Sequence, residues 1–260
     1  MAKASKPKAK DGKGEYHTGL KKRDLAPRCL LVGSPARAVM IAETFFEGAK
    51  QVGDDHRGYK CFTGKHRGMD ISVVTTQIGC PSTGIVLPES VRSGAKVFIR
   101  VGSCGTLQRM PRVGHVAICT GAVRLDGATK NWAPIEYPAI ADYRIVAALV
   151  AAAKELRLPH HVGVGATTDC FVEGQARPGY KNYIPPWLKE QFKWLQHLKV
   201  LFYSMEESGI FVWCASHGGF PAGAIDAIFA NRVTEDWGEE GQKEAAQIAI
   251  EAFHRLDELL

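Results

Sequence analysis

The sequence KVFIRVGSCGTLQ, residues 96–108, decides the fold of this chain. Residues 97–101 are mostly β-branched or aromatic and apolar, which predicts a buried strand. Gly102-Ser103-Cys104-Gly105 follows directly and predicts a glycine-rich turn where that strand ends. Arg100 lies inside the apolar run, where a cation is costly unless an anion or a carboxylate lies beside it.

Arg100 and the turn after it have two interpretations. Backbone amides of the turn, the Ser103 hydroxyl and the guanidinium fork together suit a small tetrahedral anion. Alternatively, Arg100 forms an ion pair with a neighbouring acid, and the glycines only close the turn. Residues 96–108 taken alone favour neither interpretation.

A second corner of the same kind lies nearer the N-terminus. Residues 28–33 (RCLLVG) predict a buried strand, Ser34 is a good helix N-cap, and Pro35 suits the first helical position. The helix that follows is predicted to reach residue 46 and carries Arg37 in its first turn. A cation there opposes the helix dipole, so either an anion lies beside Arg37 or its side chain points into water.

Strands and helices alternate along the whole chain. Strands are predicted at residues 28–33, 58–68, 69–76, 97–101, 116–120, 162–168 and 222–230. Helices are predicted at residues 35–46, 85–93, 139–156, 208–217 and 242–260, with a loop and a helix over residues 180–199. This alternation predicts an α/β fold, a single-domain three-layer αβα structure with a central mixed sheet. Ligands of such sheets bind beyond the strand ends, where the glycine-rich turns lie.

Composition limits the classes of protein to consider. The chain has 260 residues, of which 45% are hydrophobic and 23% charged, as in ordinary globular domains. It has no apolar run long enough to span a membrane and no secretory signal at its start. Seven cysteines without a C-x-x-C pair argue against a disulfide framework or a zinc site. We therefore expect a cytoplasmic protein that does not bind membranes.

The net charge of +6 is unevenly distributed. Residues 1–14 contain five lysines and one aspartate, which predicts a disordered Lys-rich tail ahead of one domain at residues 15–260. The domain itself has no basic stretch of the kind that binds nucleic acid. We expect the tail to aid solubility; a nucleic-acid-binding tail is the alternative.

Six segments, in this order, resemble motifs of the nucleoside phosphorylase superfamily, and most closely its uridine phosphorylases. They are GSPAR (33–37), QIGCPSTG (77–84), RVGSCGTLQ (100–108), VRLDGA (123–128), FVEGQAR (171–177) and YSMEES (203–208). A single segment would be weak support. Six with matching spacing, covering the chain from about residue 16 onward, make the resemblance strong.

The resemblance implies a pentosyltransferase that cleaves uridine reversibly to uracil and ribose 1-phosphate in pyrimidine salvage. Inorganic phosphate is the co-substrate and attacks C1′ of the ribose, without a covalent enzyme intermediate, a cofactor or a metal. Such a protein must hold the anion beneath C1′, fix the sugar and stabilise the leaving base. Deoxyuridine and thymidine remain open as further substrates.

The resemblance also implies roles for individual residues. The phosphate-binding residues are Gly33, Arg37, Arg57, Arg100 and Ser103. The ribose-binding residues are His17, Ser103, Met205 and Glu206. The base-binding residues are Cys104, Gly105, Phe171, Gln175, Arg177 and Arg232. The residues expected to act in catalysis are Arg100, Gln175, Arg177 and Glu206.

Two of these residues, Arg57 and His17, match residues that relatives lend to a neighbouring subunit. The resemblance therefore implies a homo-oligomer, with a dimer as the smallest active unit and a ring of three dimers as the full assembly. Glu206 would accept hydrogen bonds from ribose hydroxyls, and Gln175 with Arg177 would bind the uracil carbonyls and N3–H.

Three positions depart from the family pattern. Ser34 replaces an aspartate, Glu207 stands where a small residue is usual, and Ala230 stands where purine-cleaving relatives place an acid. The last departure favours a pyrimidine, and Asp226, four residues earlier, is predicted to be structural. The alternatives are a purine nucleoside phosphorylase, a nucleosidase of the same fold, or a nucleoside-binding relative without catalytic activity.

Overall fold

The structure is a computed structural model that describes residues 14–55 and 57–259. The predicted tail, residues 1–14, lies outside the described residues except for Gly14. The strands are β1 (Arg28–Val32), β2 (Glu47–Val52), β3 (Cys61–His66), β4 (Met69–Thr75), β5 (Val97–Thr106), β6 (Val116–Leu125), β7 (Ala139–Ile140), β8 (His160–Thr168), β9 (Phe202–Ser204) and β10 (Ala222–Asn231). The helices are α1 (Pro35–Phe45), α2 (Cys80–Arg92), α3 (Tyr143–Glu155), α4 (Pro186–His197), α5 (Glu207–Ser216) and α6 (Gln242–Leu259), and short 3-10 helices include Ala128–Asn131, Glu173–Gln175 and Tyr180–Asn182.

All of these strands belong to one mixed sheet in the order β10-β6-β8-β9-β5-β1-β4-β3-β2, with β7 paired to β6. Strand β10 also pairs with β5, so β5, β9, β8, β6 and β10 close into a ring. Strand β5 belongs both to this ring and to the open part of the sheet, because β1 pairs with its other side. The stretch quoted first therefore lies at the centre of the fold.

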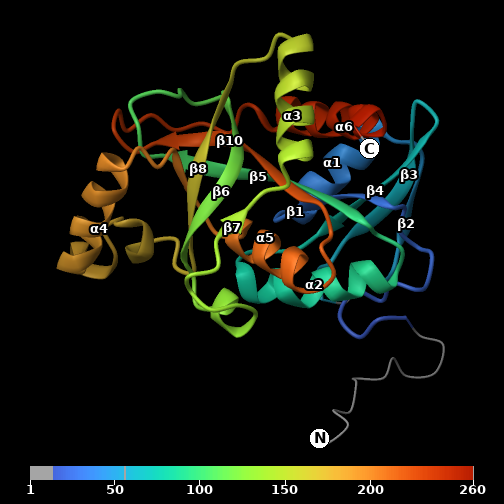
Figure 1. Cartoon of the computed structure of the whole chain (residues 1–260), viewed down its shortest axis with the longest axis horizontal. Coiled ribbons are helices and arrows are strands. Elements are labelled where there is room, and N and C mark those ends of the chain that lie inside the picture. The colour runs from blue at the N-terminus through green and yellow to red at the C-terminus, as the bar shows by residue number, and fades with distance from the viewer. Residues whose placement is uncertain (1–13, 56, 260) are drawn as a thin grey trace, which may run out of the picture.

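Helices cover both faces of the sheet. Figure 1 shows α3 and α6 on one side and α2 and α5 on the other, with α4 standing apart at one end of the molecule. The alternation of side chains along β1 explains the two cores, since Leu30 and Val32 pack with α1, α3 and α6, whereas Leu31 packs with α2 and α5. The predicted α/β class with a central mixed sheet is confirmed.

Helix α5 is unusual because it is buried on every side. Residues 207–214 are all buried, as expected of a helix that is apolar around its circumference. Its first residue, Glu207, carries a charged side chain and is the exception to this apolar character. A carboxylate fully buried at the start of this helix requires a partner, and that partner lies in β5.

The turn predicted at Gly102-Ser103-Cys104-Gly105 is wrong, because β5 continues to Thr106. Strand β10 pairs with β5 from Phe98 to Thr106, and β9 pairs with its last two residues. The glycines serve a different purpose here. A Cβ on Gly102 would lie 2.0 Å from Asp226 Oδ1 and 2.7 Å from Arg100 Nη2, so this position must stay empty for those side chains.

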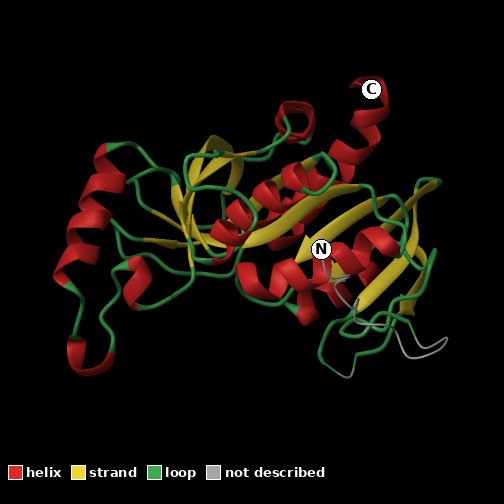
Figure 2. Cartoon of the chain, turned by 60° about the horizontal axis from the view of Figure 1, so that its bottom comes forward, coloured by secondary structure: helices red, strands yellow, loops and turns green. Residues whose placement is uncertain are grey.

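Other differences concern element boundaries. Helix α2 begins at Cys80, within the predicted turn at 77–84, after Gly79 adopts a φ of 91°. Residues 139–140 form β7 instead of the first turn of α3, which is capped by Asp142 accepting from the amide of Arg144. Strands β2 and β9 were not predicted, because β2 lacks apolar alternation and β9 has only three residues. Figure 2 shows the layers from a second side.

Candidate active site

A cavity of about 510 Å³ lies where β1, β5 and β10 end. These three strands are parallel, so their carboxyl ends meet on one side of the sheet, where open α/β sheets bind ligands. The predicted residues that line the cavity are Gly33, Arg37, Arg100, Ser103, Cys104, Gly105, Phe171, Gln175, Arg177, Met205 and Glu206. These predicted residues come from four distant segments of the sequence, which thus meet in one cavity.

Arg37 points inward, so the interpretation that it points into water is wrong. Its side chain is 6% exposed. Nη1 donates to the Val101 carbonyl oxygen at 3.2 Å, and Nε donates to Gln242 Oε1 at 3.0 Å. Burial, with a contribution from the charge of Arg100, lowers the pKa of Arg37 to about 10. Arg37 is still a cation at neutral pH, and an anion between the two arginines would relieve their repulsion.

Arg100 is 4% exposed and meets three acids. Nη2 lies 2.6 Å from Glu206 Oε2, Nε lies 2.8 Å from Glu207 Oε1, and Nε lies 3.7 Å from Asp226 Oδ1. Arg100 therefore forms the ion pairs of the second interpretation, but the glycines after it extend β5 and do not close a turn. Its Nη1 is buried and has no hydrogen-bond partner within residues 14–55 and 57–259, which leaves one donor for an anion.

The consecutive residues Glu206 and Glu207 have different environments. Glu206 lines the cavity, and its Oε1 accepts from the amide of Gly79 at 2.7 Å. Burial raises the pKa of Glu206, although the charge of Arg100 opposes this. Glu207 is 0% exposed and contacts the Ser204 hydroxyl beneath the cavity. Of the two glutamates, only Glu206 therefore lines the cavity; its predicted contact with ribose stays a prediction.

The opposite end of the cavity carries an amide and a guanidinium. Gln175 is 3% exposed and lies in a short 3-10 helix, and Arg177 lies just after it with its Cζ 4.5 Å from the centre of the Phe171 ring. The Arg177 Nε is buried without a hydrogen-bond partner in the described chain. Burial lowers the pKa of Arg177. This end offers donors and one amide oxygen to a flat polar ring.

Arg232 does not line the cavity but supports its wall. Nη1 donates to the Gln175 carbonyl oxygen at 2.8 Å, and Nη2 donates to the Ala176 carbonyl oxygen at 3.3 Å. Burial lowers the pKa of Arg232 to about 10, and the neighbouring charge of Arg177 adds to the effect. Arg232 therefore holds the loop that carries the amide and the guanidinium.

His17 and Arg57 lie outside the cavity. The His17 Nδ1 is 2.8 Å from Glu89 Oε1. The Arg57 Nη2 donates to the Tyr16 hydroxyl at 3.3 Å, and its Cζ lies 5.2 Å from the centre of the Tyr16 ring. A single chain therefore does not bring either side chain to the other predicted residues.

Several residues of the cavity wall were not predicted. Ser34 occupies the N-cap position of α1 but makes no side-chain capping bond in the described chain, and it lines the cavity. Tyr203, Phe229 and Trp237 line it as well. Phe229 lies in β10 with Arg37 Cζ 5.8 Å from its ring centre. Trp237 is 69% exposed and bridges to Ala230. An aromatic residue in a strand predicts core packing, so no sequence signal separates these rings from ordinary core residues.

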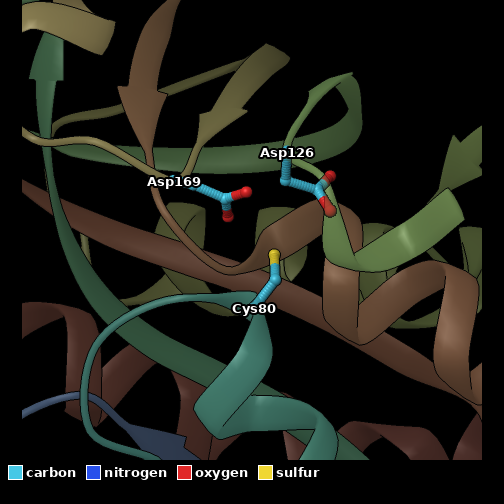
Figure 3. A group of neighbouring side chains, drawn as sticks. All are labelled: Cys80, Asp126 and Asp169. Atoms are coloured by element: carbon cyan, nitrogen blue, oxygen red, sulfur yellow. The ribbon is translucent and has the colours of Figure 1, made fainter. Parts of the chain in front are cut away.

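Cys80, Asp126 and Asp169 come close enough to be considered as metal ligands (Figure 3), with their ligand atoms within 4.8 Å of one another. Asp126 is already bonded, because its carboxylate accepts from the Thr129 amide at 2.7 Å and the Ser208 hydroxyl at 2.6 Å. Burial raises the pKa of the Cys80 thiol, which opposes metal ligation by sulfur. These groups join α2, α5 and the end of β6, and a metal is not a good fit.

Comparison with known proteins agrees with this geometry. A sequence model of the phosphorylase superfamily matches residues 27–260, so the chain belongs to this superfamily. The chain is 40% identical over 255 residues to the uridine phosphorylase of Thermococcus kodakarensis, covering 98% of this chain and 91% of the relative. It is 34% identical over 249 residues to the uridine phosphorylase of Escherichia coli, covering 93% of this chain and 97% of the relative.

A third relative differs in its named substrate. The guanosine phosphorylase of Halorubrum lacusprofundi is 30% identical over 217 residues, covering 84% of this chain and 83% of the relative. The predicted membership in the nucleoside phosphorylase superfamily is confirmed, and so is the predicted similarity to uridine phosphorylases. Within the described residues, every helix is too short or too polar to span a bilayer.

Proposed function

We propose that this protein is a pentosyltransferase that catalyses the reversible phosphorolysis of uridine to uracil and ribose 1-phosphate. One observation carries the proposal: a single cavity joins two buried arginines at one end to an amide and a guanidinium at the other. Glu206, 2.6 Å from Arg100, is the one carboxylate among the described residues that line this cavity. These three kinds of group match the needs of phosphate, ribose and base in the reaction.

At the phosphate end, Arg37, Arg100 and Ser103 hold inorganic phosphate beneath C1′, with the Gly33 backbone beside it. Arginine suits a tetrahedral dianion because its planar fork donates two parallel hydrogen bonds. Binding both reactants in one cavity makes the attack on C1′ effectively intramolecular. The cationic surroundings also stabilise the phosphate as its charge moves toward the sugar.

In the middle of the cavity, Glu206 accepts hydrogen bonds from the ribose hydroxyls while Met205 packs against the sugar. At the far end, Gln175 and Arg177 bind the polar groups of uracil, and Phe171 packs against its ring. As the glycosidic bond breaks, negative charge develops on the departing base. The Arg177 guanidinium, whose Nε has no hydrogen-bond partner in the described chain, stabilises this charge.

The test is release of uracil from uridine with and without inorganic phosphate. The proposal expects release only with phosphate, together with formation of ribose 1-phosphate. Release without phosphate would indicate a hydrolytic nucleosidase instead. Tight binding of uridine without turnover would indicate a nucleoside-binding protein.

A purine nucleoside is the second candidate, favoured by the similarity to a guanosine phosphorylase. Against it, the cavity wall carries Ala230 where an acid would protonate a purine. A panel of uridine, deoxyuridine, thymidine, inosine and guanosine, each assayed with phosphate, separates these substrates. Preferred turnover of guanosine or inosine would replace uridine in the proposal.

The proposal includes a homo-oligomer in which a neighbouring copy supplies Arg57 and His17, with a dimer as the smallest active unit and a hexamer as the assembly. It is supported by the position of both side chains outside the cavity of their own chain. Residues 15–260 act as one cytoplasmic domain, and phosphate is the co-substrate of a reaction without cofactor or metal. Activity that survives dilution to monomers would refute the shared site.

A further inference from the structure

Three carboxylates converge on one guanidinium beneath the cavity, and the proposed reaction uses only one of them. Glu206 and Glu207 are consecutive residues, and Asp226 comes from the middle of β10. Glu207 and Asp226 are both 0% exposed and do not line the cavity. Neither can touch a substrate there, so their cost of burial requires another explanation.

The charge of this group is unbalanced. If all three acids were ionised, Arg100 and the neighbouring Arg37, whose charge interacts with Glu206 and Asp226, would leave one uncompensated negative charge in the interior, next to the position proposed for a dianion. Such an arrangement is strongly unfavourable in a region that water cannot reach. A proton held by one of the acids removes part of this repulsion.

The hydrogen bonds indicate which acid holds the proton. Glu207 has donors: Arg100 Nε at 2.8 Å, the Ser204 hydroxyl, and the Glu206 amide at 3.4 Å. Asp226 has none, since neither of its oxygens accepts a hydrogen bond from a donor in the described chain. A carboxylate without donors is costly, whereas a neutral carboxyl can itself donate to Glu207, with which Asp226 interacts. Burial and the charge of Glu207 raise the pKa of Asp226.

Room for this arrangement is provided by Gly102. A Cβ at that position would lie 2.0 Å from Asp226 Oδ1 and 2.7 Å from Arg100 Nη2. Any other residue would displace the acid or the guanidinium. The close approach of Asp226 and Arg100 at Gly102 thus brings together side chains from β10 and β5, and Glu207 of α5 binds the same guanidinium.

We infer that Glu207 and Asp226 are positioning residues for Arg100, and that the single proton held between these two acids resides on Asp226. Glu207 accepts a hydrogen bond from Arg100 Nε, and Glu206 pairs with Arg100 Nη2. Arg100 Nη1, which has no hydrogen-bond partner in the described chain, is thereby left to donate to phosphate. Neutral Asp226 fills the remaining space without adding charge beside the dianion. The inference depends on the proposed function, because it assumes that phosphate binds at Arg100.

The test compares Glu207→Gln with Asp226→Asn in the full chain. Glu207→Gln keeps the size but removes the charge that holds Nε, so the KM and Kd for inorganic phosphate are expected to rise about tenfold, with the KM for uridine changed less than about twofold. Asp226→Asn reproduces the neutral acid, so phosphate binding is expected to stay within about twofold of wild type. Asp142→Asn, the same change at the remote N-cap of α3, is the control.

An infrared difference spectrum provides a readout that a purely structural role would not change. The spectrum of wild type minus Asp226→Asn should contain the C=O stretch of a protonated carboxyl. Calorimetry with inorganic phosphate alone measures Kd without turnover. If Glu207→Gln does not fold, Glu207→Asp, which withdraws the charge by one methylene, tests the same contact and should also raise the phosphate KM selectively.

The outcomes are distinguishable. Wild-type protein that neither binds nor uses phosphate would overturn the proposed function and this inference together. Wild-type phosphate binding with unchanged binding in Glu207→Gln would overturn only the positioning role. Loss of phosphate affinity in Asp226→Asn, or absence of the protonated-carboxyl band, would show that Asp226 is ionised and overturn the shared proton.

Discussion

The two ends of the cavity are built differently. The phosphate end is carried by the middle of β5 and the first turn of α1, and Arg100 there is 4% exposed with three acids around it. The base end is carried by a loop and a short 3-10 helix, and Phe171 there is 55% exposed. In the proposed reaction the anion is thus held by regular structure, while base selection is left to a segment that can vary without disturbing the sheet.

The largest effect is expected at the phosphate end. Arg100→Ala leaves three buried acids without their cation, so the free energy of unfolding should fall by about 3–5 kcal/mol. kcat/KM for phosphate should fall by on the order of 1,000-fold, because a guanidinium that stabilises the reacting anion is lost. Steady-state kinetics and urea denaturation measure the two effects.

Arg92→Ala is the control for that variant. Arg92 forms an exposed ion pair with Glu15, with Nη2 2.7 Å from Oε2 and an Arg92 side chain 55% exposed. Its loss should cost less than about 1 kcal/mol and leave phosphate use unchanged. Equal losses of unfolding free energy and of kcat/KM for phosphate in Arg100→Ala and Arg92→Ala would contradict the larger role assigned to the buried arginine.

A smaller effect, on the use of uridine and not on the use of phosphate, is expected at the base end. Gln175→Ala removes an amide that is 3% exposed and faces the cavity. kcat/KM for uridine should fall by roughly 10- to 100-fold, because buried groups of the base lose their partner. The KM for phosphate should stay nearly constant. A matched rise in the phosphate KM would show that the two ends are not independent.

A still smaller effect is expected from Phe171→Ala. The ring lies 4.5 Å from Arg177 Cζ, a contact of the cation–π type. Its loss should reduce kcat/KM for uridine by about two- to fivefold, since such contacts contribute about 0.5–1 kcal/mol at exposed sites. Kinetics over a uridine concentration series measure this change. A loss as large as that of Gln175→Ala would mean that ring packing, and not hydrogen bonding, dominates base binding.

The smallest effect concerns pH and lies away from both ends. His66 Nδ1 and His254 Nε2 are 2.9 Å apart, joining β3 to α6, and burial lowers the pKa of both rings. His115 Nδ1 and His161 Nε2 are 3.0 Å apart, and burial likewise lowers both of their pKa values. No histidine of the described chain lines the cavity.

A pKa lowered by folding means that the unfolded chain takes up protons first. The stability that these pairs contribute is therefore present above about pH 6.5 and lost as the pH falls through the lower folded-state values. The free energy of unfolding measured at about pH 7.5 and about pH 5.5 should show this decrease, and His254→Gln should reduce it. An unchanged decrease in the variant would assign the pH dependence to other groups.

Sequence reasoning succeeded where the deciding signals are local. Strand β1, the proline at the start of α1 and the apolar spacing of α6 are set by neighbouring residues, and all three agree with the structure. The motifs also selected most of the residues that line the cavity. Their roles in catalysis stay predictions.

Predictions from the sequence were wrong or incomplete where contacts with segments far away in the chain determine the local structure. Gly102-Ser103-Cys104-Gly105 has the composition of a turn, but pairing with β10, more than 100 residues later, keeps it extended. Phe229 and Trp237 carry no mark that distinguishes a cavity wall from a core. Asp226 was predicted to be structural, and no local signal indicated that it lies beside Arg100.

The position of β5 has a consequence for local opening. It pairs with β10 along one side, and with β1 and then β9 along the other, so loss of any one neighbouring strand still leaves β5 paired to the rest of the sheet. Its amide protons should exchange with solvent only when the whole molecule unfolds. Arg100, the arginine proposed to bind phosphate, is therefore anchored in the part of the chain that would be the last to exchange its amide protons for deuterium.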